Sequence, residues 1–328
     1  MTIKEIADAL GISTSTVSKA LNNATDVSEK TRKKVQDYAD SVGFSFKNVG
    51  PQKRICMLFE NMDSQSNLQV GYSVLTGFQH AANNFHYEVV VEHCTDTCAP
   101  NLKDLCRENN FIGVMVLGTK LTSDIIKQLE ETDVPVMLMD SYVKNPKVSC
   151  ISSDNINSIS AIVEQLIEDG HVNIGFLGGE KSSLVSRERF AGYVTALNGA
   201  NIEYNSNFVC YGNFTEEGGR SCAKHFIDNK VTAVVCASDI MAIGLIRGLK
   251  ELGAKVPDDI SVSGFDDLEI TRYFSPALTT VKQDFFMLGK TAFTILRQSI
   301  KGYETKRIIL QAEPIFRKST SKAPNKNS

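Results

Sequence analysis

The chain has 328 residues, which at roughly 100–200 residues per domain allows two or three domains. Hydrophobic residues make up 42% and charged residues 22%, which is ordinary for a globular protein, and the net charge is −3. No apolar run reaches the ~18 residues of a membrane helix, and no apolar signal segment is found at the N-terminus, so we expect a cytoplasmic protein without a membrane partner. The eight cysteines are therefore expected to be reduced.

The charge is distributed unevenly along the chain. Residues 1–54 carry nine Lys/Arg and six Asp/Glu, a balance of +3. The other 274 residues carry 26 basic and 32 acidic side chains, a balance of −6. A mildly basic head on an acidic body is typical of a small nucleic-acid-binding module joined to a second function.

The first 45 residues have the pattern of three short helices. Thr2 and Glu5 fit a capping box at the start of a helix, and Gly11 ends that helix. Ser13 can cap a second helix and Ser28 a third, each with apolar residues repeating along one face. Two short helices joined by a glycine turn of three or four residues predict a helix-turn-helix.

The second helix of such a motif enters the major groove of DNA, where its first residues meet base edges. Hydroxyl groups can bond base edges or phosphates, and lysine can reach guanine or phosphate. The predicted DNA-binding residues are Thr14, Ser15, Thr16, Ser18, Lys19 and Asn22. The alternative interpretation is a polar surface on an ordinary small helical bundle.

From residue 54 onward, short apolar runs alternate with amphipathic stretches. Such runs are typical of buried parallel strands, and the stretches between them are typical of helices that cover both faces of a sheet. The body is therefore predicted to be α/β and doubly wound, and at over 250 residues it has room for two lobes. Strands are predicted over residues 55–59, 87–91, 111–117, 134–139, 173–177, 231–236 and 260–265.

Several of these segments resemble the LacI/GalR family of bacterial repressors. The head carries GISTSTVSKALN at residues 11–22, and the body carries PDDISVSGFDD at residues 257–267. Residues 186–193, 237–244 and 276–284 are also similar, so the resemblance covers nearly the whole chain. It implies that Thr14, Ser15 and Lys19 occupy the positions that usually read bases.

The resemblance implies a small all-α helix-turn-helix head-piece followed by an α/β periplasmic-binding-protein-like domain with two Rossmann-like lobes. Because the chain of such a domain crosses between the lobes three times, neither lobe is continuous. The predicted parts are a DNA-binding domain at residues 1–45, a shortened hinge at 46–54, an effector-binding and dimerisation domain at 55–316 and a flexible basic tail at 317–328. Lobe 1 is expected at about 55–152 and 284–311, and lobe 2 at about 153–281 and 312–316.

The linker departs from the family pattern. The family normally places a hinge helix here, with a leucine that wedges into the minor groove at the dimer axis. The linker of this chain is about six residues shorter and has no leucine, and Gly50-Pro51 would break a helix. Since such wedges kink DNA by opening a base step, we predict weaker bending or a different arrangement of half-sites.

Ligands of open α/β sheets bind beyond the carboxyl ends of the strands. A carboxylate that accepts two sugar hydroxyls, opposed by a guanidinium group, suits a polyol. The predicted effector-binding residues are Asp140, Arg187, Arg189, Ser238, Asp266 and Gln283. The alternatives are a turn cap for Asp266 and a surface ion pair with Glu188 or Glu180 for Arg189. Four aromatic residues could stack on a sugar, although core packing is the simpler interpretation for each of them: Phe59, Tyr72, Phe214 and Phe265.

No metal, cofactor or catalytic site is predicted. His93 and the cysteines Cys94, Cys98 and Cys106 fit no standard zinc spacing. The stretch at residues 178–182 lacks the glycine and spacing of a P-loop, and neither a G-x-S-x-G nor an H-E-x-x-H motif occurs. The chain is therefore expected not to be an enzyme.

The sequence thus predicts a sequence-specific DNA-binding transcriptional regulator, and more specifically a repressor. Its operator affinity would be controlled by a small-molecule effector, by default a mono- or disaccharide, bound in the inter-lobe cleft. The expected partners are a pseudopalindromic double-stranded operator and a second copy of the chain, in the cytoplasm on the nucleoid. Since the C-terminal residues have no leucine heptads, we expect a homodimer rather than a tetramer. The alternative is a cytosolic sugar-binding module with a non-functional DNA head-piece.

Overall fold

The computed structural model describes residues 2–21, 24, 26–42, 44, 53–62, 65–95 and 97–324. The chain forms two compact units, residues 1–52 and residues 53–328. Within the described ranges, no helix is long and apolar enough to cross a membrane.

The first unit is a three-helix head. Its helices are α1 (Ile3–Leu10), α2 (Thr14–Leu21) and α3 (Glu29–Ser41). The Thr2 hydroxyl and the Glu5 carboxylate close a capping box on α1, and Gly11 ends that helix with a left-handed φ of 68°. The Ser13 hydroxyl accepts the N–H of Thr16 at 3.0 Å and so caps α2. The core of the head is formed by Ile6, Ala7, Val17, Ala20, Val35 and Ala39.

The second unit begins with a parallel sheet of six strands in the order β11-β5-β4-β3-β1-β2. Alternate side chains of one strand enter two different cores. Ile55 and Met57 face a core with the helices α4 and α13, while Cys56 and Leu58 face a core with α5 and α6. Helices therefore cover both faces, as predicted. The elements are β1 (Lys53–Glu60), α4 (Gln65–Asn83), β2 (Tyr87–Cys94), α5 (Leu102–Asn109), β3 (Phe111–Leu117), α6 (Asp124–Glu131), β4 (Val136–Met139), β5 (Val148–Ser153), α13 (Phe285–Ile300) and β11 (Arg307–Leu310).

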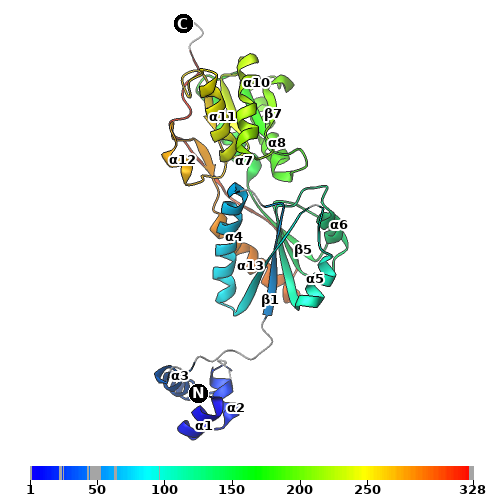
Figure 1. Ribbon diagram of the computed structural model, residues 1–328, viewed down its shortest axis with the longest axis vertical. Helices are drawn as coiled ribbons and strands as arrows, with labels where there is room; N and C mark the ends of the chain where they lie inside the picture. The colour runs from blue at the N-terminus through cyan, green and yellow to red at the C-terminus, as the bar shows by residue number, and fades with distance from the viewer. Residues whose placement is uncertain are drawn as a thin grey trace. The chain divides into compact units, whose positions relative to one another are not determined.

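A second parallel sheet has four strands in the order β7-β6-β8-β9. Its helices and strands share one continuous hydrophobic core, in which the largest side chains include Phe176, Tyr193 and Phe226. The elements are α7 (Asn155–Glu168), β6 (Ile174–Gly178), α8 (Leu184–Gly199), the 3-10 helix η1 (Ser206–Phe208), β7 (Val209–Tyr211), α9 (Glu216–Ser221), α10 (Ala223–Asp228), β8 (Ala233–Cys236), α11 (Asp239–Glu251), β9 (Ser261–Ser263) and α12 (Ile270–Tyr273). Figure 1 shows the two sheets as separate lobes of this unit.

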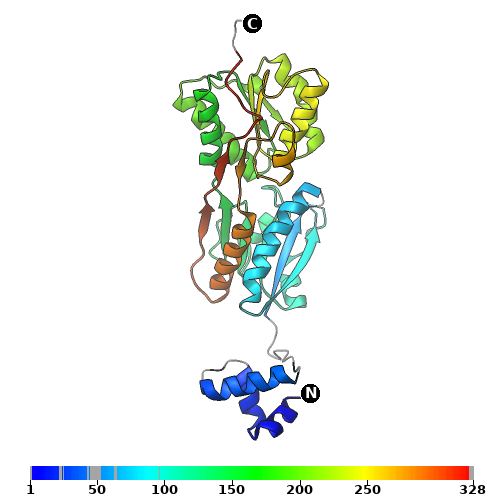
Figure 2. The ribbon, with the colours of Figure 1, turned by 90° about the vertical axis from the view of Figure 1, so that its left-hand side faces the viewer.

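The chain passes between the two lobes three times. The passages lie between β5 and α7, between β10 (Thr280–Lys282) and α13, and between β11 and β12 (Glu313–Ile315). Strands β10 and β12 pair antiparallel, and Figure 2 shows these connecting segments running between the lobes. The two-lobed α/β architecture expected from the sequence is confirmed.

The C-terminal segment differs from the predicted flexible tail. Arg317 Nη2 bonds Asp267 Oδ1 at 2.5 Å, and the fully buried Ser319 donates its hydroxyl to the carbonyl of Val262 at 2.6 Å. The N–H of Ala323 bonds the carbonyl of Asp169 at 2.9 Å. The prediction of a tail was wrong for residues 317–324, because their small hydroxyl side chains satisfy buried backbone groups of the second lobe.

The linker ends two residues earlier than predicted. Lys53 and Arg54, which we expected in the linker, already belong to β1 and pair in register with Tyr87 and Glu88 of β2. The rest of the predicted hinge, residues 46–52, lies outside the described residues. Its expected effect on DNA bending stays a prediction.

The cysteines do not all remain free thiols as expected. Cys210 on β7 and Cys222 at the start of α10 form a disulfide with their Cα atoms 6.4 Å apart. The other six cysteines form no disulfide, and of these only Cys98 is exposed. Composition and compartment could not reveal the pair, because the fold alone brings the two sulfur atoms together.

Candidate functional site

The exposed face of α2 carries most of the predicted DNA-binding residues. Val17 and Ala20 are fully buried in the core of the head, which turns the opposite face of the helix toward solvent. Thr14 and Ser15 are exposed in the first turn, where the N–H groups of a helix favour anions such as phosphate. Lys19 is also exposed, one turn further along.

Three residues of this set differ in their surroundings from Thr14 and Ser15. Thr16 is half-buried and its hydroxyl lies 2.8 Å from that of Ser13, so part of its bonding capacity serves the helix cap. Lys19 Nζ forms an exposed ion pair with Asp26 at 2.5 Å, which DNA would have to replace. Ser18 is half-buried, and Asn22 lies outside the described residues.

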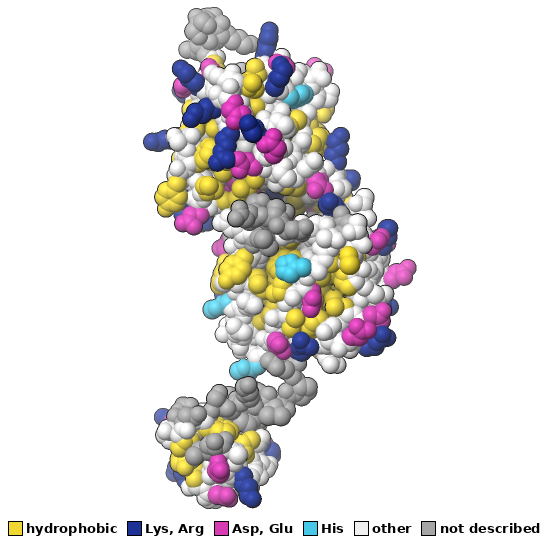
Figure 3. Space-filling model, viewed as in Figure 1, with side chains coloured by type: hydrophobic (Ala, Val, Ile, Leu, Met, Phe, Trp, Pro, Cys, Tyr) yellow, Lys and Arg dark blue, Asp and Glu magenta, His cyan; other side chains and the backbone are white. Residues whose placement is uncertain are grey.

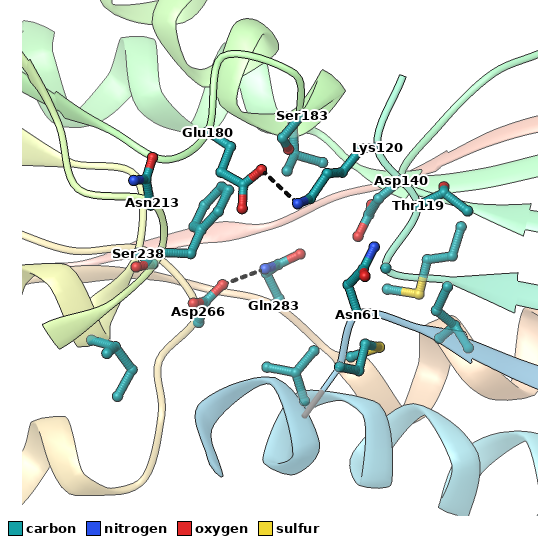
Figure 4. Close-up of a pocket in the computed structure, with 18 of the residues that line it drawn as sticks. Asn61, Thr119, Lys120, Asp140, Glu180, Ser183, Asn213, Ser238, Asp266 and Gln283 are labelled. Carbon is teal, nitrogen blue, oxygen red and sulfur yellow. Dashed lines mark hydrogen bonds and ion pairs between the residues drawn. The ribbon is translucent and has the colours of Figure 1, made fainter. Parts of the chain in front are cut away.

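A cavity of about 430 Å³ lies between the two lobes of the second unit. Most of its polar side chains come directly after the carboxyl ends of parallel strands, at the edges where the two sheets face each other. In Figure 4, Asn61, Lys120 and Asp140 from one lobe and Glu180 and Asp266 from the other point toward a shared space. The residues that follow strand ends are Asn61, Thr119, Lys120, Asp140, Glu180, Asn213, Ser238 and Asp266, joined by Ser183, Arg189 and Gln283 from later segments.

Arg189 is the most firmly held charged group of the cleft. The residue is 4% exposed, and its Nε donates to Asn155 Oδ1 at 2.9 Å while its Nη1 donates to the carbonyl of Ala237 at 2.6 Å. Its guanidinium carbon lies 3.7 Å from the ring centroid of Phe265, in a cation–π arrangement. Burial lowers the pKa of Arg189, and the nearby Asp266 and Asp140 carboxylates oppose that change. The guanidinium is thus fixed before any ligand binds.

Asp266 lies beside Gln283, as Figure 4 shows, and its Oδ1 accepts a hydrogen bond of 2.7 Å from Gln283 Nε2. Its φ of 125° is a backbone conformation that residues with side chains rarely adopt, and such conformations gather at functional sites. Burial raises the pKa of Asp266 to about 6, although the charge of Arg189 and the bond from Gln283 both favour the ionised form.

Asp140 supplies a carboxylate from the other lobe. It follows β4 with a left-handed φ of 56°, and its Oδ1 accepts the hydroxyl of Ser152 at 2.9 Å. Burial raises its pKa, while Ser152 and Arg189 act in the opposite direction. The cavity therefore has an acidic group on each side and a guanidinium group on the second lobe, an arrangement that can bind hydroxyl and N–H donors from two directions.

Ser238 and its neighbour Asp239 also form hydrogen bonds that stabilise the surrounding structure. The Ser238 hydroxyl accepts the N–H of Met241 at 3.3 Å and caps α11, and the residue also lines the cavity. Asp239 is fully buried, where Thr280 Oγ1 donates to it at 2.5 Å and the N–H of Leu268 at 2.8 Å. Burial and the charge of Asp266 raise the pKa of Asp239. Through its bond with Leu268, this carboxyl holds the loop after β9, which carries Asp266.

The structure does not bring Arg187 into the cleft. The residue is exposed, and its Nε donates to the carbonyl of Lys181 at 2.8 Å. Arg187 and Arg189 are two residues apart on α8, and successive helical residues turn by about 100°, so the two side chains point about 200° apart. The prediction that both arginines reach one ligand was wrong for Arg187.

Sequence reasoning missed several cleft residues. Lys120 from the first lobe and Glu180 from the second form an ion pair of 3.2 Å across the cavity, drawn in Figure 4. Asn61 and Asn213 also line the cavity. Each of these follows the end of a parallel strand, so the rule that selected Asp266, applied to every strand, would have found them.

The four aromatic candidates lie in different surroundings. Phe214 lines the cavity, where its ring covers the backbone of Gly179 so closely that a Cβ there would lie 2.1 Å from Phe214 Cζ. Phe59 and Phe265 are buried, and Tyr72 is 70% exposed. Of the four, Phe214 is therefore the one placed to stack on a ligand. Among the described residues, no group of three or more His, Cys, Asp and Glu could hold a metal ion.

Known protein families match both parts of this chain. Residues 2–45 match the bacterial regulatory proteins of the lacI family, and residues 163–320 match the periplasmic binding protein-like domain. The HTH-type transcriptional repressor PurR of Photobacterium profundum is 31% identical over 332 aligned positions, and the alignment covers 97% of this chain and 98% of that protein. The chain belongs to the LacI family.

Solved structures agree with this assignment. The lac repressor dimer bound to operator and the anti-inducer ONPF has a TM-score of 0.75 and 25% identity to this LacI-family chain, covering 98% of it and 99% of the lac repressor chain. The complex of the transcriptional regulator CelR with cellobiose has a TM-score of 0.74 and 26% identity, covering 97% and 99%. The predicted family and fold are confirmed. The relatives of this chain are transcriptional repressors rather than enzymes. The chain is a transcriptional repressor of the LacI family.

Proposed function

We propose that this LacI-family repressor binds a pseudopalindromic operator as a homodimer, and that a small neutral polar ligand in the inter-lobe cleft controls its affinity for DNA. The observation that carries the proposal is the cavity in which Asp140 and Asp266 from opposite lobes converge beside the buried Arg189. A ligand that contacts both lobes stabilises one relative arrangement of them. It can then shift operator affinity by the difference between its affinities for the two arrangements, typically ~1–3 kcal/mol.

The head supports DNA recognition through α2. A single helix-turn-helix buries little surface, so sequence specificity requires two heads related by a two-fold axis. The proposed contacts come from the exposed first turn and from Lys19, which exchanges Asp26 for guanine or phosphate when DNA binds. We propose the full set as Thr14, Ser15, Thr16, Ser18, Lys19 and Asn22.

The surface of the body supports self-association. Tyr72 on α4 is 70% exposed, and Ile270 and Tyr273 on α12 are 50% and 80% exposed. Figure 3 shows hydrophobic side chains exposed on both lobes of the second unit. Large apolar side chains that are exposed favour coverage by a protein partner, and in a homodimer that partner is a second copy.

The charges of the cleft favour a ligand without phosphate groups. Asp140, Glu180 and Asp266 supply three carboxylates, against the two cations Lys120 and Arg189, so the ionised groups sum to −1. A neutral ligand rich in hydroxyl groups can donate to the carboxylates and accept from Arg189 and Gln283. A mono- or disaccharide meets these conditions, and it is our first candidate.

A flat nitrogen heterocycle is the second candidate, and one specific observation favours it. The ring of Phe214 lines the cavity and is fixed against Gly179, so it offers a rigid surface for stacking. A base or nucleoside could stack there while its N–H groups bond Asp266 or Asp140. The two candidates share the polar groups and differ in their use of Phe214.

Selection of bound sequences from a random duplex pool at fixed moderate salt is the first test. Enrichment of a pseudopalindrome supports the DNA half of the proposal and gives the half-site spacing. The enriched duplex then serves as the anisotropy probe for two ligand sets, sugars and nucleobases with their nucleosides. Calorimetry on the same sets measures binding directly. Ligand binding with no enrichment, in the presence or absence of that ligand, would favour a sugar-binding module with a non-functional head-piece.

The Phe214→Leu variant separates the two ligand classes. Leucine keeps an apolar wall but removes the aromatic face. A heterocycle should lose affinity for this variant, whereas a sugar held by Asp266, Asp140 and Arg189 should be affected much less. Equal losses for both classes would mean that the substitution acts through the shape of the wall alone.

A further inference from the structure

The loop after β7 forms part of the wall of the ligand cleft. Asn213, Phe214 and Thr215 line the cavity, and Asn213 and Phe214 have left-handed φ values of 52° and 56°. Such conformations are unfavourable for residues with side chains and persist where the surrounding structure holds them. The contacts that hold this loop therefore determine the shape of one cleft wall.

Two cysteines enclose this loop in the sequence. Cys210 on β7 and Cys222 at the cap of α10 are joined as a disulfide, with a Cα–Cα distance of 6.4 Å that lies within the usual range for such bonds. The strand β7 is three residues long and lies at the edge of its sheet, paired with β6 along one side. A short edge strand has few ladder hydrogen bonds, so a covalent link to α10 contributes much of its attachment.

Four of the remaining thiols are poor competitors for oxidation. Cys56, Cys106, Cys150 and Cys236 are buried, and burial raises the thiol pKa of each, which keeps them protonated. Cys210 is half-buried, whereas Cys222 is 4% exposed. A small reagent in solution therefore meets the sulfur of Cys210 first, and Cys222 is the partner that resolves the intermediate.

We propose that Cys210 and Cys222 form a reversible thiol–disulfide site, and that its oxidation stiffens the loop 212–215 in the cleft wall. The oxidant is a low-molecular-weight disulfide such as glutathione disulfide. The thiolate of Cys210 attacks one sulfur of this disulfide, which forms a mixed disulfide and releases one thiolate. The thiolate of Cys222 then attacks the sulfur of Cys210 and releases the second.

The exchange balances in atoms and electrons. Two protein thiols are oxidised to one disulfide, the external disulfide is reduced to two thiols, and the two protein protons pass to the released thiolates. The reverse exchange with excess external thiol restores Cys210 and Cys222. The site is thereby sensitive to the thiol–disulfide ratio of its surroundings, whichever ligand occupies the cleft.

Peptide mapping of the full chain after incubation in reduced and oxidised glutathione buffers, without denaturant, tests the chemistry. We expect a cross-linked peptide pair joined through Cys210 and Cys222 in the oxidised buffer and its loss in the reduced buffer. The exposed Cys98 is the internal control, and the Cys98→Ser variant should give the same cross-link. Glutathione retained on Cys210 without a cross-link, or a cross-link that persists in the reduced buffer, would overturn the proposal.

Hydrogen exchange of the same two samples tests the effect on the cleft wall. We expect the backbone amides of residues 211–216 to exchange at least about tenfold more slowly in the oxidised protein, because the closed loop has fewer open conformations. The Cys210→Ser variant should exchange at one rate in both buffers. Equal rates in the oxidised and reduced wild-type protein would show that the disulfide forms without stiffening the loop, which contradicts the proposal.

Discussion

Replacing Asp266 by asparagine should stabilise the repressor near neutral pH while it weakens the response to ligand. An asparagine side-chain oxygen can still accept the hydrogen bond from Gln283 Nε2, which spans 2.7 Å in the wild-type protein. The substitution therefore removes the ionisable group and keeps the local contact. Its effect reports the free energy of holding a carboxylate in the closed cleft.

The direction follows from the pKa of Asp266. Burial raises that pKa to about 6 in the folded protein, from 3.8 for an unperturbed carboxyl group. The folded state therefore holds the proton more tightly than the unfolded state. The resulting stability is complete below pH 3.8 and is lost as the pH rises through about 6.

The magnitude is a difference of about two pKa units, or at most ~3 kcal/mol at ~1.4 kcal/mol per unit. Asp266 is only half-buried, so solvent screening reduces this value and we expect about 1–2 kcal/mol between pH 4 and pH 7. Asparagine does not ionise, so the Asp266→Asn variant does not lose this stability as the pH rises. The stability difference between Asp266→Asn and the wild type should thus grow with pH across this interval.

Denaturant unfolding of both proteins at several pH values between 4 and 7 measures this difference. The exposed Asp133→Asn variant is the matched control and should show no such growth. The difference between the free energies of unfolding of Asp266→Asn and the wild type could instead stay constant from pH 4 to pH 7. Ionisation of Asp266 would then not lower the stability of the folded protein. The reasoning from its burial would then fail.

Three further predictions test other parts of the structure. Arg189→Met should abolish the response of operator binding to ligand while Arg187→Ala preserves it, and a loss in both variants would show that the surface arginine also contributes. Lys19→Ala should weaken operator binding by about 1–3 kcal/mol in anisotropy titrations and reduce the salt dependence, and unchanged affinity would remove Lys19 from the reading set. Ser319→Ala should lower the free energy of unfolding by about 1–3 kcal/mol, because the hydroxyl bonds the carbonyl of Val262 at 2.6 Å and the N–H of Thr279 at 2.8 Å. A thermal midpoint equal to that of the wild type would mean that the C-terminal segment adds nothing to stability.

The local pattern of the sequence was sufficient for the head and for the class of the body. Caps are made by side chains within three residues of the helix start, so Thr2 with Glu5 and Ser13 with Thr16 could be identified without any tertiary information. Buried parallel strands need apolar side chains on both faces, and Ile55 to Leu58 show this in one short run.

The same rules located part of the cavity between the lobes. Asp140, Ser238 and Asp266 follow strands, and the structure places all three at the cavity, together with Arg189 and Gln283. Helical geometry could also have separated Arg189 from Arg187, since residues two apart on a helix point to nearly opposite sides.

Other features depend on contacts between residues far apart in the chain. The ion pair between Lys120 and Glu180 joins two lobes, and the disulfide of Cys210 with Cys222 joins an edge strand to a helix. Ser319 packs into the second lobe, where it forms hydrogen bonds with residues 40 or more positions away in the sequence. Composition and periodicity describe neighbours along the chain, whereas these contacts follow from how the sheets stack and where the crossovers return. The sequence by itself therefore determined the helices of the head, seven of the twelve strands that the described residues form, and the family. Only the tertiary structure decided which strand ends meet across the cleft.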